Sequence, residues 1–227
     1  MSGLRRRARP RRWASVLAGV VAMAGLGFGA PVTATEEPKF VRLLQEGDFE
    51  WRRYGPTIVA EVLVDGDLDS ASSRGFRLLA GYIFGGNQAV SAVSAAPRSE
   101  RIAMTAPVTV EPRLPGQAGA TDRLAGAQRW RVQFTMPSRY TLASLPHPTN
   151  PAVTLRELPG YECAVLTFSG FITEAKVQAK ADALRAWAAG RSRRVTGSPQ
   201  LWRYDPPWTL PFMRRHELVF ELAPATH

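Results

Sequence analysis

The stretch Phe49-Glu-Trp-Arg-Arg-Tyr-Gly-Pro56, with the apolar run Ile58–Val64 behind it, decides how this chain is interpreted. A second stretch of the same kind begins at Val153. It reads Val153-Thr-Leu-Arg-Glu-Leu-Pro-Gly160 and is followed by the apolar run Cys163–Phe168. Self-similarity at a fixed spacing indicates an internal repeat. The chain is therefore expected to contain two related units, at about residues 40–140 and 150–223.

A helical pattern follows each apolar run. In the second unit Thr173 is a suitable N-cap, Gly190 is placed to stop the helix, and apolar residues recur at helical spacing at Val177, Ala181, Leu184 and Ala188. In the first unit a helix is expected from about Asp69 to Phe84, before Gly85-Gly86. Its apolar face would carry Phe76, Leu79, Ala80 and Ile83.

Two further strands are expected after each helix. Trp130–Met136 alternates cleanly between apolar and polar residues, and Ile102–Val108 does so less clearly. Their counterparts are Gln200–Tyr204 and Glu217–Leu222. Residues 111–129 are rich in Pro, Gly and Ala and are predicted to form a mobile hairpin loop.

These elements predict an α+β fold. Two pseudo-symmetric strand-helix-strand-strand repeats would form one distorted eight-stranded sheet, curled into a partial barrel with two main helices packed on it. A chain of 227 residues is long enough for one domain with a sizeable core. We expect that single domain at residues 35–227.

Residues 1–34 have the three parts of a secretory signal peptide. An arginine-rich stretch ends at Arg12, an apolar stretch runs from Trp13 to about Phe28, and Val32-Thr33-Ala34 forms a small-residue exit. Cleavage is expected after Ala34, with Ala30 as the alternative. The mature protein would be periplasmic or secreted and would keep no stable membrane span, although an uncleaved signal anchor is a second interpretation.

The net charge of +10 would ordinarily favour a nucleic-acid partner. Residues 1–34, however, hold six arginines and no acidic residue, so the rest of the chain carries 23 basic residues against 19 acidic ones. We therefore expect no nucleic-acid partner. Cys163 is the single cysteine, lies in an apolar run and is predicted to be a buried thiol outside any disulfide.

The sequence contains no Gly-x-Ser-x-Gly elbow, no nucleotide-binding glycine loop, no zinc-type His/Cys spacing and no Cys-x-x-Cys-His haem-attachment motif. No acid–base pair is evident, and binding is favoured over catalysis. Glu61 is the one carboxylate within an apolar strand. It shares a face with Val59 and Leu63, which is interpreted as either a cavity wall or the solvated side of the sheet.

Seven strings occur in order along the chain and together carry a family resemblance: Tyr82-Ile-Phe-Gly-Gly-Asn87, Ile102-Ala-Met-Thr-Ala-Pro-Val108, Phe134-Thr-Met-Pro-Ser-Arg-Tyr140, Pro146-His-Pro-Thr-Asn-Pro151, Phe168-Ser-Gly170, Tyr204-Asp-Pro-Pro-Trp-Thr-Leu-Pro-Phe212 and Arg214-Arg-His-Glu217. Across about residues 40–222 the series resembles the SOUL haem-binding family. The segment between Asn87 and Ile102 looks longer than is usual there, and His216 replaces the usual asparagine.

The resemblance implies non-covalent binding of haem b or a related porphyrin, a small-molecule tetrapyrrole, for buffering or transfer in the cell envelope. The tetrapyrrole would lie in an apolar slot between the first helix and the Tyr-Asp-Pro-Pro loop. Haem is an apolar plate with two carboxylates on one edge, so its site needs apolar walls and cations at the rim. The side chains expected to line the slot are Arg74, Phe76, Leu79, Ala80, Ile83, Trp208, Leu210 and Phe212, with Arg74 as the propionate partner.

No axial ligand is assigned to the haem iron. His216 is a weak candidate, because it shares strand parity with Leu218 and Phe220 and should point to the apolar side of its strand. Two other functions stay open: an enzyme that acts on a tetrapyrrole or another small hydrophobic substrate, and an envelope interaction protein with a vestigial pocket.

Overall fold

The computed structural model describes residues 35–90, 98–113, 124, 126–206 and 208–224. Residues Thr35–His227 form one compact unit, and the described hydrophobic core lies within it. The elements follow in the order β1 Phe40–Glu46, β2 Phe49–Tyr54, β3 Thr57–Asp65, α1 Leu68–Ile83, β4 Asn87–Gln88, β5 Val108–Pro112, β6 Arg129–Thr135, β7 His147–Pro148, β8 Thr154–Leu158, β9 Tyr161–Phe168, α2 Glu174–Ala189, β10 Val195–Arg203, the 3₁₀ turn η1 Pro211–Met213 and β11 His216–Leu222.

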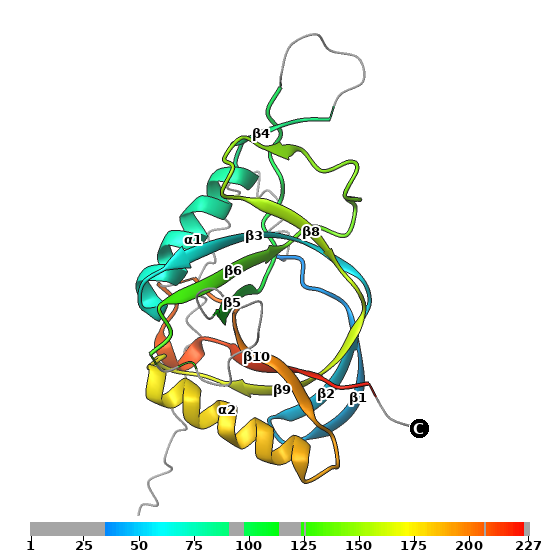
Figure 1. Ribbon diagram of the computed structural model, residues 1–227, viewed down its shortest axis with the longest axis vertical. Helices are drawn as coiled ribbons and strands as arrows, with labels where there is room; N and C mark the ends of the chain where they lie inside the picture. The colour runs from blue at the N-terminus through cyan, green and yellow to red at the C-terminus, as the bar shows by residue number, and fades with distance from the viewer. Residues whose placement is uncertain (1–34, 91–97, 114–123, 125, 207, 225–227) are drawn as a thin grey trace, which may run out of the picture. The chain divides into compact units, whose positions relative to one another are not determined.

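The large sheet has nine strands in the order β1-β2-β9-β11-β10-β5-β6-β3-β8, and every pair in it is antiparallel. The order is symmetric about the β10–β5 pair: β11 corresponds to β6, β9 to β3 and β2 to β8. The predicted α+β fold with two pseudo-symmetric repeats and two main helices is therefore confirmed. The sheet is curved but not closed, and β1 adds a ninth strand at one edge (Figure 1).

The two repeats exchange strands. β2 and β3 are joined by Gly55-Pro56 but do not pair, because β2 pairs with β9 and β3 pairs with β8. β8 and β9 are joined in the same way by Pro159-Gly160. The two connections touch, since a Cβ atom on Gly160 would lie 2.9 Å from the carbonyl oxygen of Tyr54. The crossing point thus requires glycine for steric reasons.

Each helix covers the outer face of one half of the sheet (Figure 1). α1 packs on β3 and β6, and α2 packs on β9, β10 and β11. α2 begins after the predicted N-cap Thr173, whose hydroxyl accepts a hydrogen bond from the Lys176 amide, and it ends at the predicted stop, Gly190. Its predicted apolar face is fully buried, with 0% exposure at Val177, Ala181, Leu184 and Ala188.

One predicted strand is wrong. Ile102–Val108 is not a strand, and β5 begins only at Val108. The amide of Ile102 donates to the carbonyl of Ile83 at the end of α1, and the amide of Ala106 donates to the carbonyl of Glu36. Both amides therefore form their hydrogen bonds outside the large sheet. The alternating pattern belongs to a loop, which the buried side chain of Ile102 anchors. The β5–β6 hairpin is present, and most of its predicted loop lies outside the described residues.

Replacing Gly160 with Ala should destabilise the fold by about 1–3 kcal/mol, the usual range for overpacking, because the new methyl group meets backbone that cannot move aside. Gly55→Ala is the matched control: its Cβ would meet nothing within 4 Å. That change should leave stability unchanged or raise it by about 0.4–1 kcal/mol. Urea denaturation of both variants measures the difference, and equal stabilities would contradict the crossing.

Candidate functional site

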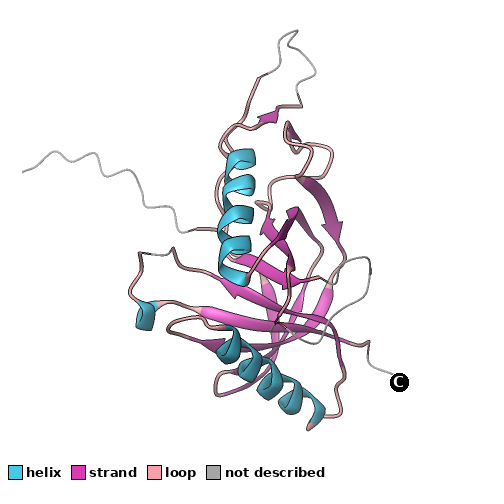
Figure 2. Ribbon diagram, turned by 60° about the vertical axis from the view of Figure 1, so that its left-hand side comes forward, coloured by secondary structure: helices cyan, strands magenta, loops and turns pink. Residues whose placement is uncertain are grey.

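The connection between β10 and β11, residues 204–215, of which all but residue 207 are described, leaves the sheet beside the N-terminal ends of both helices (Figure 2). Its stem is held by two hydrogen bonds. The Tyr204 amide donates to the Arg215 carbonyl at 3.3 Å, and the Arg215 amide donates to the Asp205 carboxylate at 2.6 Å. At the end of β10, the Arg203 guanidinium donates to the Ser72 hydroxyl of α1 at 2.9 Å. The loop is therefore fixed against the first helix at its base.

The outer part of the loop is also tied to the segment before α2. The Gly170 amide donates to the Pro211 carbonyl at 2.9 Å, which places Phe171 next to η1. Within the loop the Arg214 guanidinium donates to the Thr209 carbonyl at 2.7 Å, and the Met213 amide donates to the Leu210 carbonyl at 2.9 Å. These bonds give the two segments one shared, ordered surface.

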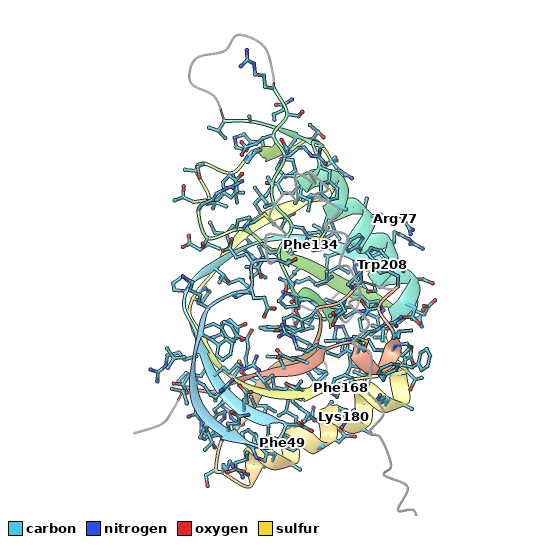
Figure 3. The ribbon with its side chains drawn as sticks, turned by 180° about the vertical axis from the view of Figure 1, so that it is seen from behind. Phe49, Arg77, Phe134, Phe168, Lys180 and Trp208 are labelled. Carbon is cyan, nitrogen blue, oxygen red and sulfur yellow. The ribbon has the colours of Figure 1, made fainter. Side chains whose placement is uncertain are left out.

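That surface is strongly apolar and exposed to solvent. Five large apolar side chains on it, here called the apolar tip, are exposed by 82% at Trp208, 71% at Phe212, 69% at Phe171, 63% at Met213 and 55% at Leu210. Trp208 lies beside α1 in the view from behind (Figure 3). A concentration of exposed apolar groups of this kind is typical of interaction surfaces.

The predicted residues of α1 divide into two groups. Leu79 and Ile83 are 0% and 1% exposed and belong to the main core, whereas Phe76 is 37% exposed and packs edge-on against Phe134. Ala80 is partly buried, and the exposed Arg74 donates to the Asp65 carbonyl at 3.3 Å. Of the four apolar side chains predicted on this helix, Phe76 is the most accessible to a ligand. A role of any of these residues in ligand binding stays a prediction.

A basic cleft of about 560 Å³ adjoins the apolar tip. Phe212 and Met213 line it together with four cationic side chains, Lys176, Lys180, Arg214 and Arg215. Asp48 is the one acidic residue among the described residues that line the cleft. The cleft therefore joins an apolar wall to a rim that attracts anions.

His216 is the first residue of β11, directly after the 204–215 loop. It is 1% exposed, its ring packs 5.5 Å from the Phe168 ring, and neither ring nitrogen has a hydrogen-bond partner within the described part of the chain. Burial, together with the positive charge of Arg203, lowers the pKa of His216 to about 4, although the nearby Gly170 backbone acts in the opposite sense. His216 thus points to the apolar side as predicted. An axial role for it stays a hypothesis.

His216 should make the fold sensitive to acid. Its pKa is about 6.5 in the unfolded chain and about 4 in the fold, so the unfolded state binds more protons in this window. As the pH falls from 6.5 to 4, the fold should lose up to about 3 kcal/mol through this group. Glu111, whose pKa burial raises to about 7, acts in the opposite direction between pH 7 and 4.5.

Urea denaturation across this pH range should therefore compare the wild type with His216→Leu, because the contribution of Glu111 is common to both proteins. The variant should lose less stability on acidification. Identical pH dependence in the two proteins would show that His216 is not buried in its neutral form.

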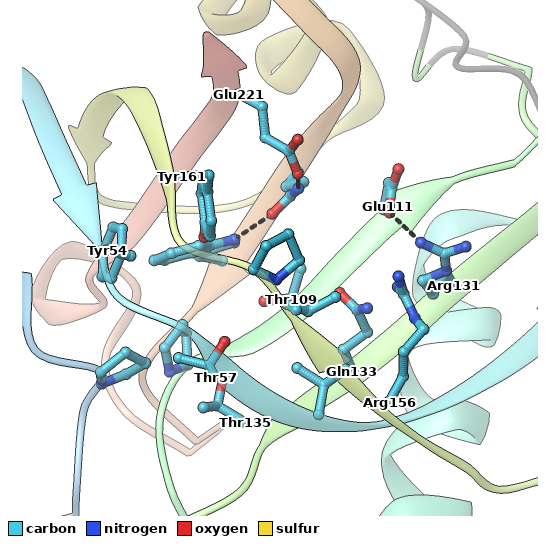
Figure 4. Close-up of a pocket in the computed structure, with 17 residues that line it drawn as sticks. Tyr54, Thr57, Thr109, Glu111, Arg131, Gln133, Thr135, Arg156, Tyr161 and Glu221 are labelled. Atoms are coloured by element: carbon cyan, nitrogen blue, oxygen red, sulfur yellow. Dashed lines mark hydrogen bonds and ion pairs between the residues drawn. The ribbon is translucent and has the colours of Figure 1, made fainter. Parts of the chain in front are cut away.

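The face of the sheet away from the helices carries a second, smaller cleft of about 210 Å³ (Figure 4). Tyr54, Tyr161 and Trp202 form one wall, with ring centroids 5.6 Å apart from Tyr54 to each of the other two. The other wall is polar and includes Glu111 and Arg131, which lie 3.4 Å apart.

Glu61 lies on the same face of the sheet. Its carboxylate accepts hydrogen bonds from Gln133 at 2.8 Å and Arg156 at 3.0 Å. The side chain is partly buried, and Leu63 on the same face is 52% exposed. Glu61 is thus held in a polar network and is absent from the residues that line the cleft.

Glu217, the last residue of the Arg214–Glu217 string, has a structural partner. The buried Arg52 guanidinium donates to both of its carboxylate oxygens, at 2.8 and 3.0 Å, and the Tyr204 hydroxyl donates to it at 2.7 Å. A bidentate pair of this kind fixes the orientation of both side chains and the register of the strands that carry them. Glu217 of β11 thereby links Tyr204, the first residue of the 204–215 loop, to Arg52 of β2.

Sequence reasoning missed several residues of these sites. Phe171 and Met213 of the apolar tip escaped it because neither lies in a periodic element, although an apolar residue between Gly170 and the N-cap Thr173 was a usable signal. Lys176 and Lys180 were interpreted only as the polar side of α2. Tyr161 and Trp202 come together only through strand pairing that is distant in sequence.

The fold and this surface define a two-repeat α+β protein with a candidate site for an apolar, anionic ligand. The model of the SOUL heme-binding protein family matches residues 35–221. The chain belongs to the SOUL haem-binding family, whose name indicates a haem or tetrapyrrole ligand. Among curated protein sequences no significant match is found.

Solved structures share the fold at low sequence identity. The C-terminal domain of EcmrR is 10% identical with a TM-score of 0.51, over 78% of this chain and 98% of that one. A hydrolase encoded by lin2189 from Listeria innocua is 14% identical with a TM-score of 0.50, over 78% of this chain and 92% of that one. At these identities the likeness establishes the architecture alone.

Two structural features are absent from the described residues. None of the described helices is both long and apolar enough to cross a membrane. Nor do His, Cys, Asp and Glu side chains gather there into a group of three or more that could hold a metal ion.

Proposed function

We propose that this protein binds haem b or a related porphyrin non-covalently, on the surface between the N-terminal half of α1 and the apolar tip. The observation that carries the proposal is the exposure of Trp208, Leu210 and Phe212, three of the predicted site residues, on a loop fixed beside α1. Membership of the SOUL haem-binding family supports the ligand class.

The residues present fit a tetrapyrrole. The tip and Phe76 would cover one apolar face of the plate, and burial of each aromatic side chain contributes about 1.5–3 kcal/mol. Proline residues at 206 and 211 limit the conformational entropy that the loop would lose on binding. The plate would lie against an open surface rather than in a closed slot, because Leu79 and Ile83 are occupied by core packing.

The propionates need cations at the rim. Arg74, the predicted partner, is exposed on α1, and Lys176, Lys180 and Arg214 line the basic cleft next to Phe212 and Met213. Guanidinium and ammonium groups both pair with carboxylates. We infer that the basic cleft takes at least one propionate and that Arg74 is the second candidate.

No residue is assigned as a ligand of the iron. His216 is buried, so it could reach a bound metal only if the groups packed around it moved. If apolar burial alone holds the ligand, the protein should bind a porphyrin with or without iron. Residues 1–34 support a role in the cell envelope, where the protein would buffer or transfer the tetrapyrrole.

Titration of the protein from Thr35 with hemin should produce a shifted Soret band, and metal-free protoporphyrin should bind with similar affinity. The double variant Trp208→Ser/Phe212→Ser should weaken hemin binding at least about 100-fold, because two aromatic contacts of about 1.5–3 kcal/mol each are lost. Phe84→Ser is the matched control, because Phe84 is 50% exposed at the other end of α1. An unchanged hemin spectrum, or equal affinity of the tip variant, would refute the proposal.

A further inference from the structure

We propose that the apolar tip docks this protein on the surface of a bilayer that contains anionic lipid. The docking goes beyond tetrapyrrole binding and requires no bound ligand. It follows from three properties of the described surface: the residue types at the tip, the rigidity of the two loops, and the charge around them.

The residue types are those that enter the boundary between lipid headgroups and acyl chains. Trp208, Phe171 and Phe212 are aromatic, and Leu210 and Met213 are aliphatic. Each is more than half exposed. Aromatic and aliphatic side chains gain free energy when they move from water into this layer, and tryptophan favours the interface in particular.

The tip is held in shape by its own hydrogen bonds. The Gly170–Pro211 and Arg214–Thr209 bonds join the two loops and close the turn at η1. Figure 2 shows η1 standing out from the sheet between the near ends of α1 and α2. A convex, ordered apolar protrusion suits insertion into a soft lipid layer, whereas a protein partner would need a hollow of matching shape.

The positive charge beside the tip indicates that the lipid headgroups are anionic. Lys176 and Lys180 lie in the basic cleft with Arg214 and Arg215, next to Phe212 and Met213. Over the described ranges, no carboxylate lies within ion-pair distance of either lysine. Lys176 donates to the Ser169 carbonyl, and the Lys180 ammonium group lies 5.9 Å from the centre of the Phe168 ring. Basic side chains beside inserted apolar ones are attracted to anionic headgroups.

Docking would also bring the proposed tetrapyrrole surface to a layer where an apolar plate with two carboxylates concentrates. This link rests on the proposed function. The docking itself does not, because the residue types, the loop geometry and the charges are properties of the ligand-free protein.

Sedimentation with vesicles tests the proposal, using the protein from Thr35 so that the apolar segment of residues 1–34 cannot contribute. The wild type should sediment with vesicles of phosphatidylglycerol and phosphatidylcholine and only weakly with phosphatidylcholine alone. The variants Trp208→Ser/Phe212→Ser and Lys176→Gln/Lys180→Gln should each lower the partition coefficient at least about tenfold, and added salt should weaken binding.

Phe84→Ser/Leu142→Ser is the matched control, because it removes two exposed apolar side chains outside the tip, 50% and 43% exposed. It should bind like the wild type. No sedimentation of the wild type, or equal binding by the tip variant, would overturn the proposal, and so would equal binding to neutral vesicles. Hemin is absent here and lipid is absent from the hemin titration, so either proposal can fail alone.

Discussion

The contact between Gly160 and the carbonyl oxygen of Tyr54 is the constraint on which the arrangement of this molecule depends. At this point the β2–β3 and β8–β9 connections cross, and each repeat gives one strand to the sheet half of the other. The repeats therefore cannot separate without breaking three strand pairings, β2–β9, β3–β8 and β5–β10. This interlock fixes α1 and α2 on the same side of the sheet and brings the β10–β11 loop between their N-terminal ends (Figure 1).

The two faces of the sheet have different chemistry as a result. The helix face carries the main apolar core, and the exposed apolar tip lies beside the N-terminal ends of the helices that cover it (Figure 2). The opposite face holds buried charges, among them the Arg52–Glu217 pair and the carboxyl of Glu111. Buried ion pairs add little net stability but are costly to break, so they fix register at that face. The helix face is therefore the one whose apolar character suits the proposed flat apolar ligand or lipid surface.

Much of the fold could be predicted from the sequence because it depends on local patterns. The repeat, both helices and the cap at Thr173 follow from periodicity and capping chemistry. The strand predicted at Ile102–Val108 failed because its amides bond to Ile83 and Glu36, which are distant in sequence. Periodicity identified the apolar face of α1 but could not separate Leu79, which packs in the core, from Phe76 at its edge. Only the position of the sheet decides between them.

The most direct test of the proposed site is an amide nuclear magnetic resonance titration of the protein from Thr35 with metal-free protoporphyrin, which avoids the paramagnetism of hemin. The proposed site predicts that the largest shifts fall on residues 204–215, on Gly170 and Phe171, and in the N-terminal half of α1. Shifts concentrated at Tyr161, Trp202 and Gln133 would instead place the ligand in the cleft on the opposite face of the sheet and would contradict it.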